Sequence, residues 1–109
     1  MSRFILTFMA AISISGASIQ CVQAESLIKN ADMAYGEYLA GECVTCHRSG
    51  AANDGIPSIS GMDAEAFVYI LQSYRSKELE NKVMQLVASR LDDEQIASLA
   101  VYFASLSSK

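Results

Sequence analysis

A Cys-x-x-Cys-His motif is the part of this sequence whose residue types and spacing could do chemistry. Residues 41–50 read GECVTCHRSG, so Cys43 and Cys46 are two residues apart and His47 follows directly. Three chemistries use such a motif: a zinc site, a redox-active dithiol and the covalent attachment of haem. Because two nearby cysteines alone do not distinguish them, the remainder of the chain has to.

The zinc and dithiol interpretations lack what they need. A structural zinc site takes four ligands, commonly with a second cysteine or histidine pair, whereas His47 is the only histidine and Cys21 the only further cysteine. A thioredoxin-like dithiol lies in a βαβ pattern, and this chain has neither a strand pattern nor the length for that fold. Both interpretations are therefore disfavoured.

Covalent haem attachment satisfies each of these constraints. The two thiols can add to the two vinyl groups on one side of the ring, and the histidine that follows is then placed beneath the iron. We therefore expect one haem c per chain, bound through Cys43 and Cys46, with His47 as an axial ligand of the iron. A disulfide between the two cysteines beside an idle histidine is the less specific alternative.

The second axial ligand must be another residue type, because the chain has a single histidine. Methionine is the usual partner, and its thioether raises the reduction potential. Met84 lies 37 residues after His47, which is far enough for the chain to wrap around the ring and return on the opposite face. Met62 is the alternative ligand, whereas Met33 precedes the motif and is expected to fill the core.

The first 24 residues have the pattern of an export signal. Arg3 precedes an uncharged run of apolar and small residues, and Val22 and Ala24 occupy the positions that a signal peptidase reads. We expect cleavage after Ala24, which removes 24 of the 109 residues and leaves 85, residues 25–109, as one domain in the periplasm.

Two alternatives to cleavage remain open. An uncleaved membrane anchor would need about 20 strongly apolar residues, and this stretch is diluted by serine, glycine and glutamine. Lipidation at Cys21 would need a small residue before the cysteine, where Gln20 stands instead. No stable membrane insertion of the mature chain is therefore expected.

The charge balance argues against nucleic acid as a partner. One of the eight Lys and Arg residues, Arg3, lies in the expected export signal. The remaining chain has seven Lys and Arg residues and twelve Asp and Glu residues, a formal net charge of −5. Nucleic-acid binding takes its affinity largely from basic patches. A chain of 85 residues is also near the size at which a core alone supplies little stability, so a covalently held group would help to stabilise it.

Four helices are expected to position these residues. Apolar side chains recur at helical spacing in residues 31–44, 63–76, 79–91 and 92–106. Asp63 is available as an N-cap, and Asp92 with Gln95 suits a capping box. Residues 49–61 are rich in glycine and serine and are expected to form a loop. The expected fold class is therefore all-α.

With these motifs and helices, the mature chain resembles a small class I cytochrome c. GEYLAGECVTCH resembles the helix that runs into the haem motif, with Gly36 at a helix crossing and Tyr102 of the last helix packed against it. GIPSISGM resembles the loop whose proline carbonyl receives the ring N–H of the haem histidine, which implies that Pro57 binds His47. NKVM resembles the segment of the ligand methionine, which supports Met84. The resemblance implies helices wrapped around one covalent haem.

Within that class, residues 57–84 resemble the single-haem cytochrome subunit of flavocytochrome c sulfide dehydrogenase. The resemblance implies periplasmic electron transfer without catalysis by this chain alone, and a flavoprotein partner that carries FAD and oxidises sulfide. A free-standing electron carrier that serves other redox proteins is the alternative. A gas-binding haem protein would need an open or easily displaced sixth position on the iron.

Overall fold

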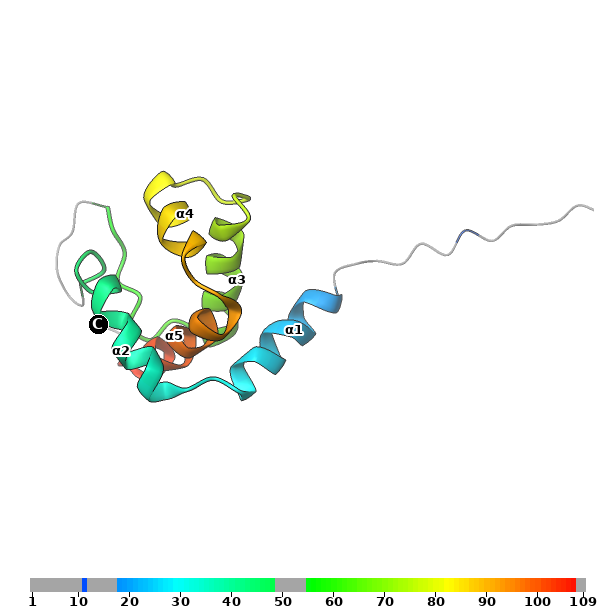
Figure 1. Ribbon diagram of the computed structural model, residues 1–109, viewed down its shortest axis with the longest axis horizontal. Helices are drawn as coiled ribbons and strands as arrows, with labels where there is room; N and C mark the ends of the chain where they lie inside the picture. Colours follow the sequence, from blue (N-terminus) through cyan, green and yellow to red (C-terminus); the bar gives the residue numbers. More distant parts are fainter. Residues whose placement is uncertain (1–10, 12–17, 49–54, 108–109) are drawn as a thin grey trace, which may run out of the picture.

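The structure is a computed structural model that describes residue 11, residues 18–48 and residues 55–107 (Figure 1). This part of the chain contains helices and loops and no strand. The helices are α1 (Ser18–Lys29), α2 (Met33–Cys43), α3 (Ala64–Arg75), α4 (Lys82–Ser89) and α5 (Asp93–Ser105). The expected all-α fold class is confirmed.

Side-chain caps determine where four of the helices begin. The cap residue of each accepts a hydrogen bond from a backbone N–H of the first turn, which would otherwise be unpaired. These residues are Asp32, Asp63, Asn81 and Asp92. Asp92 and Gln95 form the capping box that the sequence indicated. Because Asn81 caps α4, that helix starts three residues later than its apolar pattern suggested.

The core lies where α2 and α3 pack against α5. The inward face of α5 is formed by Ile96, Leu99, Ala100 and Phe103, all of them buried. The ring of Phe103 stacks on Phe67 of α3, with centroids 5.6 Å apart. α5 is therefore the central helix, against which α1, α2 and α3 pack.

α2 crosses α5 at Gly36. A Cβ on this residue would overlap the carbonyl group of Ser98, so a residue without a side chain is required there. Two hydrogen bonds join the same helices: the Asp32 N–H donates to Ser98 Oγ at 3.1 Å, and Gln95 Nε2 donates to the Tyr35 hydroxyl at 3.0 Å. This close crossing fixes the direction in which α2 delivers the Cys-x-x-Cys-His motif.

α1 was not among the expected helices, because its first residues lie in the expected export signal. Ala24 is buried, and Leu27 and Ile28 pack against the core formed with α3 and α5. The expected cleavage point after Ala24 therefore falls inside this helix, and cleavage there stays a prediction. No helix in the described ranges is long and apolar enough to cross a membrane.

Candidate functional site

The motif forms one further turn at the end of α2. Cys43 is the last residue of that helix, and its carbonyl accepts hydrogen bonds from the N–H groups of Cys46, at 3.2 Å, and His47, at 2.9 Å. Residues three and four positions apart lie on the same side of a helical turn. The turn therefore keeps both thiols and the imidazole within reach of one bound group.

The imidazole of His47 is oriented by Pro57. The His47 Nδ1 atom lies 2.7 Å from the Pro57 carbonyl oxygen, the contact that the family resemblance implied. Because a carbonyl only accepts, we assign the proton to Nδ1, which leaves Nε2 as the nitrogen that can bind a metal. Ser58, the next residue, has a buried hydroxyl with no hydrogen-bond partner among the described residues. It could serve a polar group of a bound molecule.

A cavity of about 520 Å³ lies between α2, α4 and α5. Its apolar walls are formed by Leu39 and Cys43 of α2, Val87 of α4, Leu91 of the connection between α4 and α5, and Leu99 of α5. The polar side chains of Glu42, Arg90 and Gln95 also belong to its lining. Cavities of roughly 300 to 1,000 Å³ with mainly apolar walls are typical of cofactor sites. The volume, the apolar walls and the thiol at the edge fit a haem attached at Cys43.

The two thiols are unsuited to redox-dithiol chemistry. Both cysteines are free, Cys46 being exposed and Cys43 half-buried. Burial raises the pKa of the Cys43 thiol, and the negative charge of Glu42 adds to this effect. Dithiol catalysts need the opposite, a lowered pKa that supplies a thiolate. A neutral thiol at the wall of an apolar cavity agrees better with attachment of a cofactor.

The candidate methionine ligands occupy different positions. Met84 is half-buried on α4, packs against the core and lies one helical turn before Val87, which lines the cavity. Met62 is also half-buried, in the turn before α3, with its N–H bonded to the Ile59 carbonyl. Neither methionine is among the described residues that line the cavity, so the choice of Met84 over Met62 stays a prediction. Met33 is 47% exposed as the first residue of α2, so the expectation that it fills the core is wrong.

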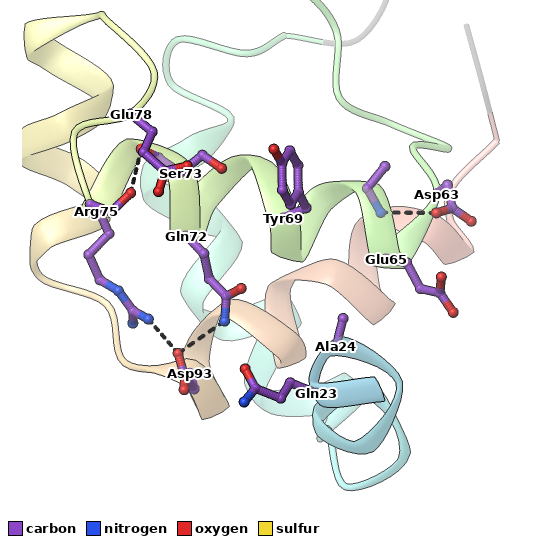
Figure 2. A pocket seen from close by; sticks show the side chains of 12 residues that line it. Gln23, Ala24, Asp63, Glu65, Tyr69, Gln72, Ser73, Arg75, Glu78 and Asp93 are labelled. Atoms are coloured by element: carbon purple, nitrogen blue, oxygen red, sulfur yellow. Dashed lines mark hydrogen bonds and ion pairs between the residues drawn. The ribbon is translucent and has the colours of Figure 1, made fainter. Parts of the chain in front are cut away.

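A larger cavity, of about 750 Å³, lies between α1, α3 and the start of α5 (Figure 2). Among the residues that the structure describes, no cysteine, histidine or methionine lines it. Its charged groups are largely acidic: Asp63, Glu65, Glu78 and Asp93, with Arg75. It therefore offers none of the thiol, imidazole or thioether groups that hold a haem. The smaller cavity is the candidate site.

The apolar walls of the candidate site are not evident from the sequence alone. Val87 and Leu91 lie three and seven residues after Met84, and this helical spacing is the signal that could have found them. Leu99 was expected on the inward face of the last helix, but its contribution to a cavity could not be foreseen. The facing helix α2 supplies the other wall.

Comparison with known proteins places the chain in a family. No protein-family model matches it. It is 32% identical over 81 residues to cytochrome c-554(548) of Halomonas halodenitrificans, an alignment that covers 68% of this chain and 95% of that protein. It is also 36% identical over 61 residues to the "Thiosulfate dehydrogenase electron acceptor" of Stutzerimonas stutzeri, covering 53% of this chain and 28% of that protein.

The almost complete coverage of cytochrome c-554(548), together with the all-helical fold, shows that this chain belongs to the cytochrome c family. It is a c-type cytochrome of electron transfer, and covalently bound haem c is the cofactor of such proteins. The chain spans only 28% of the length of the Stutzerimonas protein.

Proposed function

We propose that this chain transfers electrons through one haem c bound covalently to Cys43 and Cys46, with His47 and Met84 as the axial ligands. The observation that carries the proposal is the His47–Pro57 hydrogen bond, which leaves the second ring nitrogen for iron. The cavity of suitable size is lined by Cys43, one turn before His47. The haem, when bound, supplies a one-electron couple whose potential a thioether ligand raises. Met62 is the alternative to Met84.

Each residue has a defined task in this proposal. Pro57 accepts the Nδ1 proton of His47, which holds the ring orientation and makes the other nitrogen a better ligand. The apolar side chains of Leu39, Leu91 and Leu99 keep water away from the bound group. A dry, apolar surrounding favours the oxidation state with the lower charge, which is the reduced one.

Extraction with acid and organic solvent tests the covalent attachment. The holoprotein, produced in a periplasm that attaches haem, should keep its colour on the polypeptide. The Cys43→Ala/Cys46→Ala variant should release any haem that it holds to the solvent. Haem that leaves the wild-type chain under these conditions would refute the attachment.

For the partner, we propose a periplasmic dehydrogenase of inorganic sulfur compounds, of which a flavoprotein that carries FAD and oxidises sulfide is the specific candidate. Two observations support it: the resemblance of residues 57–84 to the cytochrome subunit of such an enzyme, and the name of the Stutzerimonas relative, an electron acceptor of thiosulfate dehydrogenase. This chain would accept electrons and would not itself bind the sulfur compound.

The exposed apolar side chains around α4 suit such a partner. Leu79, Val83 and Leu86 are 38%, 66% and 58% exposed near the helix that carries Met84. Burial of these side chains would give a largely uncharged contact that moderate salt does not weaken. The charged side chains of Lys82 and Glu80 are exposed as well and would lie between these apolar side chains.

A free-standing carrier is the second candidate, because the chain aligns with 95% of cytochrome c-554(548). Purification from native cells at raised ionic strength separates the two. Co-elution with a flavin-containing protein, and reduction of the haem by added sulfide, would support the subunit. A cytochrome that elutes alone and stays oxidised with sulfide would refute the subunit and support the carrier.

We also propose that the chain is exported and cleaved after Ala24. The mass of the protein from the periplasm should then correspond to a chain that begins at Glu25, plus one haem. Leu27 and Ile28 would remain to pack against α3 and α5 after cleavage. A longer mass, or recovery only with membranes, would contradict the cleavage site.

A further inference from the structure

α4 buries little of its own surface, and a polar contact joins the connection after it to α3. Among the described helices it packs only against α3, and Ala88 is its one buried residue. At its start, the Asn81 side chain accepts a hydrogen bond from the Met84 N–H at 3.0 Å, which caps the helix without tying it to another element. Segments with few buried apolar contacts open at low free energy. The polar contacts therefore matter more for α4 than for the other helices.

Arg75, the last residue of α3, holds the other end of α4. Its Nη1 donates to the Leu91 carbonyl at 3.0 Å, and its Nη2 donates to Asp93 Oδ1 at 2.5 Å. Gln72 Nε2 donates to the same carboxylate oxygen at 3.4 Å. Figure 2 shows Arg75 and Gln72 reaching from one helix to Asp93. One guanidinium thus joins α3 to the connection between α4 and α5.

The connection that Arg75 holds is continuous with α4. The Leu91 N–H donates to the Ala88 carbonyl, so the last turn of the helix runs on to the residue whose carbonyl Arg75 binds. Leu91 also lines the candidate haem cavity. A movement of Leu91 would therefore move both a wall of the cavity and the helix that carries Met84.

We propose that Arg75 is a positioning residue for Met84, holding α4 against α3 so that the methionine stays on the iron. The inference rests on the proposed ligation by Met84. A planar guanidinium can serve the carbonyl and the carboxylate at once, whereas the ammonium of lysine is a point charge without this fork. Loss of Arg75 loosens α4 and increases the fraction of protein in which Met84 has left the iron.

Imidazole titration of the oxidised holoprotein measures that fraction. Imidazole occupies the sixth position only when the methionine has left it, so its apparent dissociation constant varies inversely with the open fraction. Loss of the far-red sulfur-to-iron band follows the binding. For Arg75→Gln we expect an apparent affinity about tenfold higher, equivalent to about 1.4 kcal/mol, and a lower reduction potential.

Two variants serve as controls. Lys82→Gln removes one positive charge from α4 itself, and its imidazole affinity should stay within about twofold of the wild type. Arg75→Lys keeps the charge without the fork, and its affinity should lie between those of the wild type and Arg75→Gln. An increase in Lys82→Gln equal to that in Arg75→Gln would assign the effect to charge and overturn the positioning role.

The remaining outcomes separate this inference from the proposed ligation. Wild-type imidazole affinity in Arg75→Gln would overturn the role of Arg75 and leave Met84 ligation intact. A wild-type protein without the far-red band would refute Met84 ligation, and this inference with it. If Arg75→Gln yields no holoprotein, Asp93→Ala removes one of the two acceptors and should raise the affinity by about threefold. No rise in that variant would overturn the inference.

Discussion

The α2–α5 crossing and the helix α4 border the same cavity but are held in different ways. At the crossing the backbones approach closely at Gly36, and α5 contributes a continuous buried face. α4 buries only Ala88, packs only against α3 among the described helices, and is joined to it at its end by Arg75. The side that presents the two thiols and His47 is therefore firmly placed, whereas the methionine side can open at a lower free energy.

This difference separates residues that the fold requires from residues that adjust the site. Substitutions at the crossing should reduce stability and the yield of holoprotein. Substitutions on α4 should change iron ligation and the reduction potential while most of the helical structure is retained. An α4 variant that unfolds the whole chain would show that α4 and the α2–α5 crossing are not held independently.

The largest effect is expected when the covalent link is removed. Without haem, the Cys43→Ala/Cys46→Ala chain should be largely unfolded, because about 85 residues form only a marginal core unaided and the cavity would lose the group that fills it. Far-UV circular dichroism during heating measures this. A cooperative helical melt of that variant would show that the crossing is stable without the cofactor.

Gly36→Ala tests the crossing directly. The added Cβ would overlap the Ser98 carbonyl, and relief requires α2 to move away from α5. We expect the free energy of unfolding to fall by about 2 to 3 kcal/mol, as for other overpacked sites. Glu37→Ala, an exposed neighbour in the same helix, should change it by less than about 0.5 kcal/mol. Equal effects would mean that the crossing is not tight.

Met84→Ala tests the other side of the comparison. The far-red band of the oxidised protein should disappear and the reduction potential should fall, because no thioether would remain on the iron. The melting of the helices should change less than in Gly36→Ala. Met62→Ala should keep the band; loss of the band in that variant alone would transfer the ligand role to Met62.

Much of the fold follows from local patterns in the sequence. The helical spacing of apolar residues and the capping residues Asp63 and Asp92 act within one or two turns, so they located α3 and α5. The position of the Cys-x-x-Cys-His motif after a helix was also predictable, since the apolar pattern runs into Cys43. His47 and Pro57 are ten residues apart, and only the family resemblance joined them.

The features that the sequence did not reveal depend on contacts between distant segments. Arg75 binds residues 16 and 18 positions away, and no local pattern encodes that partnership. The packing of α1 was hidden because an export signal is expected to leave the fold. Met33 continues the apolar pattern of α2 but stands at the exposed end of the helix.

A substitution of Lys77, in the connection between α3 and α4, should stabilise this part of the molecule. Lys77 has a φ of 67°, a left-handed conformation that glycine adopts freely, and its N–H donates to the Tyr74 carbonyl after the end of α3. Such a conformation costs an ordinary residue about 1 kcal/mol or more. Lys77→Gly should therefore raise the free energy of unfolding by up to about 1 kcal/mol, measured by urea denaturation of the holoprotein. Leu86→Gly, in the middle of α4, should lower it.

The smallest effect concerns the pH dependence of the Arg75–Asp93 contact. The hydrogen bond from Arg75 lowers the pKa of the Asp93 carboxyl below its ordinary value of 3.8. A carboxyl whose pKa is lower in the folded state stabilises the fold above the unfolded pKa. That contribution is lost as the pH falls below about 4. Both side chains are partly exposed, so it should not exceed about 0.5 to 1 kcal/mol.

Urea denaturation between pH 6 and pH 3 would measure this contribution through the difference between the wild type and Asp93→Asn. The difference should be present at pH 6 and should shrink towards pH 3, because the carboxyl becomes neutral in both the folded and unfolded states. In the Arg75→Gln background, replacing Asp93 should produce little of this pH dependence, since the guanidinium is the main cause of the lowered pKa. An undiminished difference in that background would mean that Asp93 acts on α5 alone, through its place in the first helical turn. The polar contact that joins the end of α4 to α3 would then be the bond from Arg75 to the Leu91 carbonyl alone.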